Sequence, residues 1–593
     1  MGESITAADR PAALACSAQE LTCGDAASTA TGSLTTTLLS PSPYLSSPLD
    51  SNKRRRSTTP RAHCQTRTLD SSAMAMAALL LLLPLFFLGA VLVLHAARTR
   101  RVGEKAGLKP YPLLGHLPQF LANRHRIMDW MTEVLASQPT CTLVFRRPGG
   151  VRGIITANPA NVEHILRAGF DNFPKGPRFA SLLHDFLGRG IFNADGEAWR
   201  SQRKAASYEF NTRSLRVFVA QSVHRELHGR LIPLLRRAVS SGQPIDIQDT
   251  LERYAFDNIC RVAFDHDPGQ LPDGDEDGDG ASPEAESAAI EKSRFADAFR
   301  DAANLSAGRF RYAVPGFWKI KKAFSLGSER RLRESIAIVH GYADRIIRSR
   351  REEMSMGCEK HDLLSRFMAS QSDNYTETAL RDVVISFLLA GRETTSSALT
   401  WFFWLLSSRP EVERRIRDEV AAVRARRAQG DLDNAGFDLD ELREMHYVHA
   451  AITESMRLYP PVPVNFQQAK AADVLPDGTA VGPGWFVAYN SYTTGRMESV
   501  WGKDAGEYMP ERWLDAAEGT FRPESPFRYM AFHAGPRICL GKEMAYIQMK
   551  SIVACVLEEF KLEVDGGYRP RQVASLTLRM ADGLPVKVKA RGN

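Results

Sequence analysis

The chain has 593 residues, 44% of them hydrophobic, so it can bury a large core. Its net charge of +7 is small beside 76 basic and 69 acidic side chains, and no basic stripe with interleaved aromatic residues is present, which argues against nucleic-acid binding. The eight cysteines show neither CxxC pairs nor regular spacing, so they indicate neither a disulfide framework nor a zinc site.

Residues 1–73 are rich in serine and threonine and have no apolar period, which predicts a disordered leader outside the fold. The alternative is that translation starts at Met74 or Met76, in which case the leader does not belong to the protein.

Residues 75–94 form an uncharged apolar run of about the 20 residues that cross a bilayer as a helix. Basic residues follow between Arg98 and Lys105, and such residues tend to stay on the cytosolic side of a span. We therefore predict a single-pass anchor over residues 74–97, with the rest of the chain in the cytosol. A buried core helix and a cleaved signal peptide are the alternatives.

Residues 98–118 combine basic side chains with prolines and a glycine, which predicts a stiff hinge before one soluble domain, residues 119–593. Residues 265–287 are crowded with Asp, Glu, Gly and Pro and predict an exposed acidic loop. Part of that loop fits the spacing of a calcium-binding loop, but Gly280 and Pro283 depart from the pattern, so we prefer a solvated loop. The matching positions are Asp273, Asp275, Asp277, Gly278 and Glu284.

Three long helices are predicted in the second half of the chain. Residues 379–406 are apolar at helical spacing, with Gly391 in the middle where a better helix former would be expected, so we predict a functional kink there. Residues 442–458 are amphipathic, and residues 539–557 follow a glycine-proline loop. Strand-like stretches are few and include residues 485–489 and 575–578. The predicted fold class is mainly α with a minor β-sheet.

The most specific motif is the loop Phe532-His-Ala-Gly535-Pro-Arg537-Ile-Cys539-Leu-Gly541, whose cysteine stands at the expected start of a helix. A helix N-terminus lowers a thiol pKa, which suits Cys539 to bind iron as a thiolate. A lone cysteine is otherwise usually a small buried hydrophobe. The loop resembles the F-x-x-G-x-R-x-C-x-G signature of the cytochrome P450 family. The resemblance implies a haem b iron ligated by Cys539, with Phe532, Gly535 and Arg537 around the haem.

Two further motifs resemble those of the same family. Glu454 and Arg457 match its E-x-x-R, and Arg512 lies in a segment similar to its P-E-R-F, with Trp513 in place of Phe. The resemblance implies a structural network of these three charged residues. Trp199 and Arg203 match its W-x-x-x-R, whose spacing puts both side chains on one helix face, and the resemblance implies that both contact a haem propionate. A surface ion pair and a packed Trp beside a solvated Arg are the alternatives.

The segment Ala390-Gly-Arg-Glu393-Thr394-Thr resembles the family's A/G-G-x-D/E-T-T. The resemblance implies that Thr394 and Glu393 deliver protons during the splitting of dioxygen. Alternatively, Thr394 bonds the carbonyl four residues before it. Many family members also place Arg or His in the strand after the E-x-x-R helix, whereas this chain has Asn465-Phe-Gln-Gln468, so that contact is unassigned.

Within the family, the chain resembles the plant fatty-acid omega-hydroxylases, a group that also contains jasmonoyl-amino acid hydroxylases. The similar segments are residues 172–176, 190–196, 388–394, 475–479 and 495–497. The resemblance implies hydroxylation at or near the end of an acyl chain. Seven apolar residues stand where members of the group line the substrate pocket, and they suit any hydrophobic substrate. They are Phe179, Leu182, Leu183, Phe186, Val462, Val464 and Leu576.

The chain has no GxGxxG nucleotide fingerprint, so electrons must come from another protein. The resemblance implies NADPH-cytochrome P450 reductase as that partner, a lipid bilayer as the support, and the endoplasmic reticulum membrane as the location. Two other classes remain as alternatives. They are a fatty-acid hydroperoxide lyase or isomerase, which commonly departs from the motifs that are intact here, and a non-enzymatic haem protein, which would not need Glu393 and Thr394.

Overall fold

The computed structural model describes residues 108–112, 114–210, 213–273, 283–358, 362–369, 376–427 and 436–592, which all fall within one compact unit, Arg100–Asn593. The predicted leader, the predicted anchor and most of the predicted hinge lie outside the described residues. Among the helices that are described, none combines the length and the apolar character needed to cross a bilayer.

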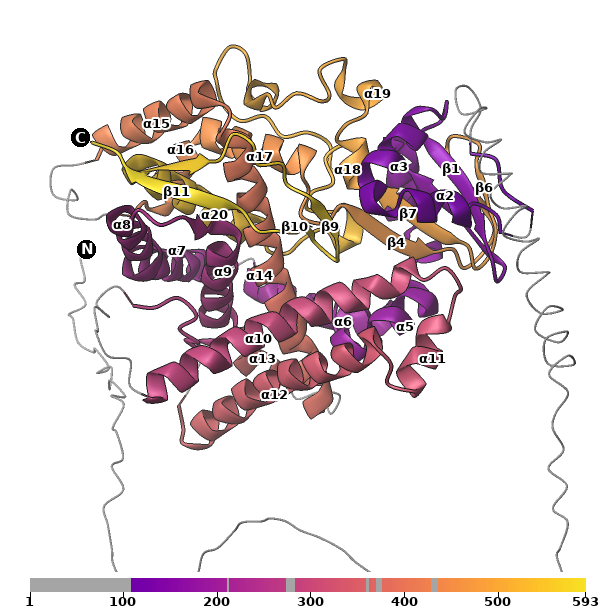
Figure 1. The fold of residues 1–593 in the computed structure, drawn as a ribbon, viewed down its shortest axis with the longest axis horizontal. Coiled ribbons are helices and arrows are strands. Elements are labelled where there is room, and N and C mark those ends of the chain that lie inside the picture. The colour runs from indigo at the N-terminus through magenta and orange to yellow at the C-terminus, as the bar shows by residue number, and fades with distance from the viewer. Residues whose placement is uncertain are drawn as a thin grey trace, which may run out of the picture. The chain divides into compact units, whose positions relative to one another are not determined.

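A four-stranded sheet joins early and late parts of the chain, in the order β1-β2-β7-β4 (Figure 1). Its strands are β1 (Thr142–Arg147), β2 (Val151–Thr156), β4 (Val464–Gln468) and β7 (Phe486–Asn490). The pairing of β2 with β7 is parallel and the other two pairings are antiparallel. The helix α3 (Ile127–Ala136) packs Trp130 and Leu135 into an apolar cluster with Phe145 of β1.

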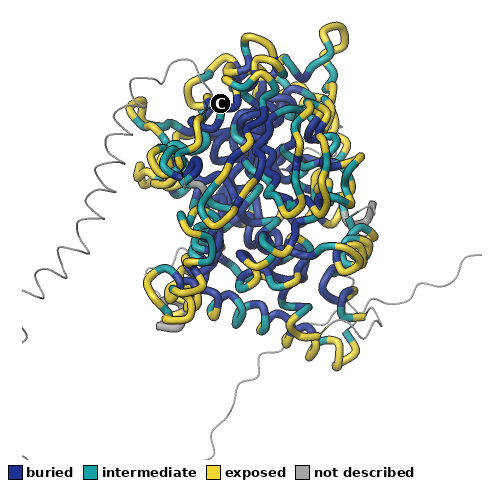
Figure 2. Tube along the Cα trace, turned by 90° about the vertical axis from the view of Figure 1, so that its right-hand side faces the viewer, coloured by how far each residue is buried: buried dark blue, intermediate teal, exposed yellow. Residues whose placement is uncertain are grey.

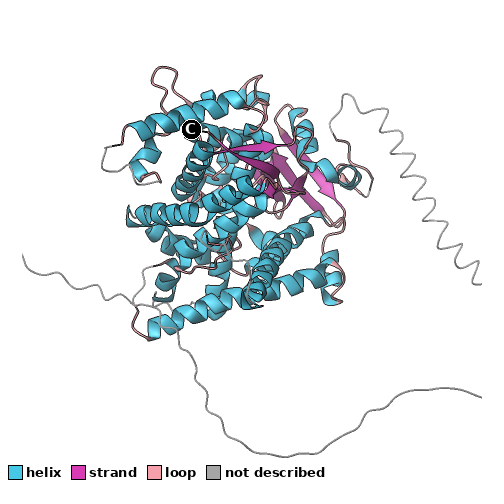
Figure 3. Ribbon diagram, turned by 60° about the vertical axis from the view of Figure 1, so that its left-hand side comes forward, coloured by secondary structure: helices cyan, strands magenta, loops and turns pink. Residues whose placement is uncertain are grey.

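The other strands form one small sheet and two hairpins, drawn in magenta with the first sheet in Figure 3. The small sheet has the order β3-β11-β8, and its strands are β3 (Ile245–Asp246), β8 (Phe560–Val564) and β11 (Pro585–Ala590). The hairpins pair β5 (Asp473–Val474) with β6 (Ala480–Val481), and β9 (Gln572–Ala574) with β10 (Leu578–Met580). The predicted strand at 485–489 is confirmed as β7. The one at 575–578 is wrong, because residues 575–577 form the turn between β9 and β10.

Helices make up most of the described chain, as predicted. Those before the longest helix are α2 (Leu117–Ala122), α4 (Pro159–Glu163), α5 (Gly176–Leu187), α6 (Gly196–Phe210), α7 (Arg213–Glu226), α8 (Ile232–Ser241), α9 (Ile247–Phe264), α10 (Pro283–Gly308), α11 (Phe317–Ala323), α12 (Ser328–Ser355) and α13 (Leu363–Ala369). Those after it are α15 (Pro410–Ala425), α16 (Leu439–Glu444), α17 (His446–Leu458), α18 (Ser491–Thr494), α19 (Glu498–Trp501) and α20 (Lys542–Glu559).

The longest helix, α14 (Glu377–Leu406), runs through the buried centre of the molecule (Figures 1 and 2). The sequence predicted this helix correctly, and α14 is unbroken across Gly391, where the kink stays a prediction. A Cβ atom on Gly391 would lie 2.4 Å from Cγ1 of Ile259 in α9. The close packing of α9 against α14 therefore requires glycine at this position.

The other two predicted helices differ from the structure at their starts. The segment 442–458 is divided into α16 and α17 at Met445, and the Glu419 carboxylate accepts the N–H groups of Tyr447 and Val448 at 2.7 and 2.8 Å. Satisfying these first-turn donors lets a new helix begin there. At the third segment, α20 begins at Lys542, three residues after Cys539.

The acidic segment 265–287 is only partly a loop. Asp267 and Asp273 accept hydrogen bonds from Arg230 at 2.8 and 2.7 Å, and α10 already begins at Pro283. Residues 274–282, which hold most of the calcium-loop pattern, lie outside the described residues. Within the described ranges, no three His, Cys, Asp or Glu side chains are grouped so as to hold a metal ion.

Candidate active site

Cys539 lies in the turn between a short 3-10 helix, Gly535–Arg537, and α20. Its N–H donates to the carbonyl oxygen of Phe532 at 2.8 Å, which closes the loop. Its side chain is exposed, yet burial raises the pKa of the thiol. The sulfur is thus deep in the fold but has a surface that no side chain covers, as a metal ligand requires.

The predicted lowering of the Cys539 pKa is not what the structure shows. Burial raises this pKa, whereas the N–H of Gly541 and the charges of Arg203 and Lys542 act in the opposite direction. Burial is the larger effect, and because Cys539 precedes α20 by three residues, the helix dipole is weaker at the sulfur than it would be within the first turn.

The loop before Cys539 is fixed by close packing and by a buried hydrogen bond. Gly535 has φ +66°, and a Cβ atom on it would lie 2.1 Å from the carbonyl oxygen of Leu166, so only glycine fits. His533 Nε2 and the Tyr489 hydroxyl are 2.5 Å apart. Burial and nearby cations lower the pKa of His533 to about 3, so its ring is neutral. These contacts hold the loop on β7.

Three cations lie near this loop, and one of them is paired with a carboxylate. Arg537 Nη2 donates to Asp195 Oδ1 at 2.8 Å, and its guanidinium lies over the Trp199 ring, 4.4 Å from the centroid. Arg203, one turn after Trp199 in α6, forms no ion pair with a described carboxylate, and its charge interacts with Cys539. The motif residues are therefore brought together by the fold.

The third cation, Lys175, was not identified from the sequence. Among the described residues its Nζ donates only to the backbone oxygen of Phe466 in β4, at 3.3 Å, and burial together with the charge of Arg537 lowers its pKa to about 7. Asp195 accepts the N–H groups of Lys175 and Gly176 at 2.9 and 2.8 Å, so it joins this segment to Arg537. Lys175 thus lies against the strand in which the family's Arg or His is missing.

These charges fit the cofactor that the cysteine loop implies. Arg203, Arg537 and Lys175 can carry three positive charges, with Lys175 fully charged once an anion lies beside it, and Asp195 is the carboxylate near them, so two positive charges are available to a ligand. Haem b carries two propionates. Leaving buried cations without partners is costly, and carboxylates are the partners that guanidinium groups bind best. Cys539 with these three cations therefore suits a haem.

The charged network behind the loop is buried and complete. Arg457 holds Glu454 through two hydrogen bonds of 2.7 Å, and Arg512 Nε lies 3.5 Å from the same carboxylate. Trp513 also donates its indole N–H to Glu454 at 2.8 Å, which a phenylalanine could not do. The three predicted members thus lie together, and Trp513 is an additional one.

Glu393 and Thr394 lie in the middle of α14. The Thr394 hydroxyl donates to the Ala390 carbonyl oxygen at 2.6 Å, as the alternative prediction for this residue expects. Its oxygen remains free to accept a hydrogen bond. Glu393 is buried, bonded to the neighbouring Arg392, and accepts from the Thr577 hydroxyl at 3.3 Å. Both carboxylate oxygens of Glu393 are thus engaged.

A chain of buried ion pairs continues from Glu393 toward the surface. Arg392 Nη2 donates to Glu252 of α9 at 2.9 Å, and Glu252 also accepts from Arg579. Arg300, which is partly exposed, lies 3.9 Å from Glu252. Burial raises the pKa of Glu252. No local pattern in the sequence indicates these partners, since they come from α9, α10 and β10.

The seven predicted pocket residues lie in different parts of the molecule. Phe179, Leu183, Phe186 and Leu576 belong to one apolar cluster, which Leu540, the neighbour of Cys539, also contacts. Val464 packs in the cluster of the four-stranded sheet, Leu182 is buried and Val462 is partly buried. Their common role as a substrate pocket stays a prediction.

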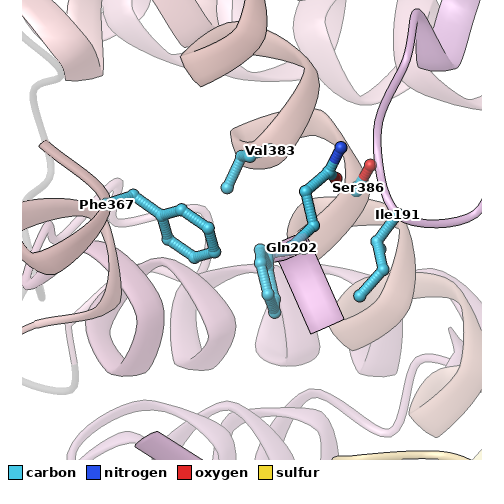
Figure 4. A pocket seen from close by; sticks show the side chains of 6 residues that line it. Ile191, Gln202, Phe367, Val383 and Ser386 are labelled. Carbon is cyan, nitrogen blue, oxygen red and sulfur yellow. The ribbon is translucent and has the colours of Figure 1, made fainter. Parts of the chain in front are cut away.

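A small hollow lies where α6, α13 and α14 meet (Figure 4). Its lining is mostly apolar, and the Oε1 atom of Gln202, the neighbour of Arg203, is buried without a hydrogen-bond partner. The lining residues are Ile191, Gln202, Phe367, Val383, Ser386 and Phe387. None of the seven predicted pocket residues lines it.

Comparisons with known proteins agree with this geometry. The family model described as Cytochrome P450 matches residues 106–584. Cytochrome P450 CYP94D108 of Paris polyphylla is 49% identical over 83% of this chain and 94% of its own. Cytochrome P450 94B1 of Arabidopsis thaliana is 45% identical over 81% of this chain and 91% of its own, and Cytochrome P450 94A1 of Vicia sativa is 43% identical over 82% and 90%. The cysteine loop, the buried Glu454 network and these matches show that the chain belongs to the cytochrome P450 family.

Proposed function

We propose that this P450 monooxygenase hydroxylates fatty acids at or near the omega carbon, with Cys539 as the iron ligand. The observation that supports the haem-thiolate part is the exposed, deeply placed sulfur of Cys539 near three cations, of which only Arg537 forms an ion pair with a described carboxylate. The chemistry that a haem with a thiolate ligand supplies is the activation of dioxygen with two electrons. Each remaining role belongs to side chains of this chain.

Positioning of the cofactor falls to the residues around the loop. Arg537, Arg203 and Lys175 would hold the two propionates, and Trp199 supports Arg537 from below through its ring. Phe532 and Gly535 keep the loop closed, through the Phe532 carbonyl oxygen and the tight passage beside Leu166. The Glu454–Arg457–Arg512 network supports the same face of the core.

Proton delivery falls to α14. The Thr394 hydroxyl oxygen can accept a hydrogen bond from a proton donor, because its own hydrogen is donated to the Ala390 carbonyl oxygen. Glu393 is the adjacent acid, and the ion pairs through Arg392 and Glu252 connect it to the partly exposed Arg300. General acids placed in this way typically contribute 100- to 10,000-fold, roughly, to a rate.

The substrate assignment rests on the resemblance to plant omega-hydroxylases and on the apolar cluster around Leu183 and Leu576, which reaches Leu540. An alkyl chain suits such a surface. Electrons would come from NADPH through the separate flavoprotein reductase. The anchor expected at residues 74–97 would hold the enzyme in the endoplasmic reticulum membrane, with its catalytic domain in the cytosol.

The test is product analysis by mass spectrometry. Microsomes that contain the full chain and the reductase are given NADPH, a panel of fatty acids and a jasmonoyl-amino acid. We expect omega-hydroxylated fatty acids, and none when Cys539→Ser replaces the wild type. Conversion of the jasmonoyl conjugate alone would make that hormone class the substrate instead.

A further inference from the structure

Two arginine side chains near the four-stranded sheet have no acidic partner among the described residues. Arg147 ends β1, and Arg178 lies in the first turn of α5; both are half-buried. Burial lowers the pKa of each, and the charge of Arg178 lowers that of Arg147 further, so the two guanidinium groups are near enough to repel. No described carboxylate forms an ion pair with either one.

Arg147 is held by backbone oxygens only. Its Nη1 donates to the carbonyl oxygen of Phe310 at 3.5 Å, and its Nη2 donates to that of Tyr312. Its Nε is buried and has no acceptor among the described residues. A guanidinium group has five N–H donors in a planar fork, so part of its capacity is unused here.

Arg178 is held by an aromatic ring. Its guanidinium carbon lies 5.6 Å from the centroid of the Phe486 ring, and no described side chain accepts from its guanidinium. A cation over a ring gains roughly 0.5–1 kcal/mol at an exposed site, which does not offset the loss of water around a half-buried charge. This guanidinium also lacks an anion.

A stack of phenylalanines connects the two arginines. The Phe486 ring lies 5.0 Å from Phe466, and Phe466 stacks on Phe310 at 4.9 Å, with an interplanar angle of 17°. Phe310 and Phe466 also border the apolar cluster that contains Leu183 and reaches Leu540, next to Cys539. A series of contacts between apolar side chains therefore runs from the two positive charges to Leu540, the neighbour of the candidate iron ligand.

A fatty acid matches this arrangement of charged and apolar side chains, because it has one carboxylate and a long apolar chain. A guanidinium fork binds a carboxylate through two parallel hydrogen bonds. We propose that Arg147 and Arg178 bind the carboxylate of a long-chain acyl substrate whose chain lies across Phe310 and Phe466 toward Cys539. This inference rests on the proposed function and deepens it, because fixing the carboxylate far from the iron leaves the opposite end of the chain to be oxidised.

The experiment compares a saturated fatty acid with its methyl ester and its primary alcohol of the same length. Affinity is measured by displacement of a fluorescent fatty acid from the haem-loaded full-length protein, so no turnover is needed. We expect Arg147→Gln and Arg178→Gln each to weaken binding of the acid roughly tenfold or more, because each removes a charge-assisted hydrogen bond. Binding of the ester and the alcohol should not change.

Two further variants control for charge and for folding. Arg152→Gln removes an exposed arginine of the neighbouring strand β2 and should leave all three affinities unchanged. Arg178→Lys keeps the charge but loses the fork, and should weaken acid binding less than Arg178→Gln does. If Arg178→Gln does not fold, a lysine variant that binds the acid as the wild type does would overturn the inference.

The outcomes separate this inference from the proposed function. If the wild type oxidises no fatty acid, but prefers the acid to the ester in an arginine-dependent way, the carboxylate site stands and the proposed reaction falls. If the wild type oxidises fatty acids and the glutamine variants bind acid and ester as it does, the carboxylate site is refuted. Variants that lose only their affinity for phosphatidylserine vesicles would assign the arginines to lipid headgroups and also refute it.

Discussion

The ammonium group of Lys175 lies beside Arg537 and bonds only to a backbone oxygen. If it holds a propionate, Lys175→Met should loosen the haem while the fold is kept. We expect the transfer of haem to excess apomyoglobin to be faster by roughly fivefold or more, which corresponds to about 1 kcal/mol. Lys470→Met, at an exposed position, is the matched control, and an equal rate in both variants would remove Lys175 from the haem site.

Thr394 is the second residue whose role can be isolated. Thr394→Ala removes a hydroxyl from the accessible middle of α14, and we expect roughly tenfold less product for each NADPH consumed, because protons reach the reacting oxygen less efficiently. Thr400→Ala is the matched control. The Thr400 hydroxyl lies further along α14 and likewise donates to the carbonyl oxygen four residues before it. Coupling measured as product over NADPH should fall only in the first variant, and an equal loss in both would point to helix stability instead.

Sequence reasoning was most informative where one short motif holds all the information. The loop from Phe532 to Gly541 and the pair Glu454–Arg457 occupy a few consecutive positions, and the structure gives each motif one compact location. It could not identify Lys175 or Asp195, because their partners are Phe466 and Arg537, about 300 residues away, and no local pattern encodes such contacts. The sequence shows that the strand after the E-x-x-R helix lacks an Arg or His. It does not show that Lys175 lies against that strand.

Between elements, the junction of α17 with the segment 510–513 depends on one indole. Trp513→Phe keeps the ring packing but leaves one hydrogen bond to the buried Glu454 unmade. We expect a loss of about 1–3 kcal/mol, seen as a lower midpoint of urea unfolding. Trp404→Phe is the control, since that indole donates to no described residue, and an equal shift in both variants would show that ring size, not the hydrogen bond, matters.

The contact between α9 and α14 tolerates no side chain at Gly391. Gly391→Ala should destabilise the protein by about 1–3 kcal/mol, because its Cβ would overlap Ile259. Gly341→Ala in α12 meets nothing within 4 Å and should instead stabilise it by up to about 1 kcal/mol. Thermal unfolding of both variants checks the prediction, and Ile259→Ala should restore part of the stability lost with Gly391→Ala. A harmless Gly391→Ala would contradict the close packing.

The same contact shows why sequence patterns missed details at this scale. Gly391 suggested a kink because glycine weakens an isolated helix, but the sequence could not show that Ile259, 132 positions earlier, leaves no room there for a Cβ atom. Likewise, nothing in residues 442–458 announces the break at Met445, which depends on Glu419 of α15. Helical periodicity locates an element well, whereas its ends and its irregularities are decided by what packs against it.

For the molecule as a whole, the exposed apolar residues are unevenly distributed. Five of them gather in and around α11, at Val314, Phe317, Ile320, Phe324 and Leu326. This surface adjoins the turn after β1, where Gly149 faces Pro315, and the start of the described chain is bonded to the same strand through His116 and Arg146. An apolar patch of this kind marks an interaction surface, and its position beside the chain start suits a bilayer.

The patch leads to a prediction about lipid contact. A chain that starts at Leu108 should still bind phospholipid vesicles, and replacing Phe317 and Phe324 by Ser should reduce the vesicle-bound fraction several-fold, since each change removes an exposed ring that a bilayer would bury. Flotation assays measure the bound fraction, and circular dichroism verifies the fold. The matched control replaces Ile290, an exposed apolar residue of α10, by Ser. Equal binding by all variants would refute a role for α11.

The surplus of positive charge around Asp195 has a consequence beyond the reaction. Until a dicarboxylate arrives, Arg203, Arg537 and Lys175 repel one another inside the core, so the newly synthesised polypeptide is held in a less stable state than the finished enzyme. Iron nutrition and porphyrin supply would then set how many copies escape degradation. The abundance of this protein in a cell would follow its prosthetic group as closely as its messenger RNA.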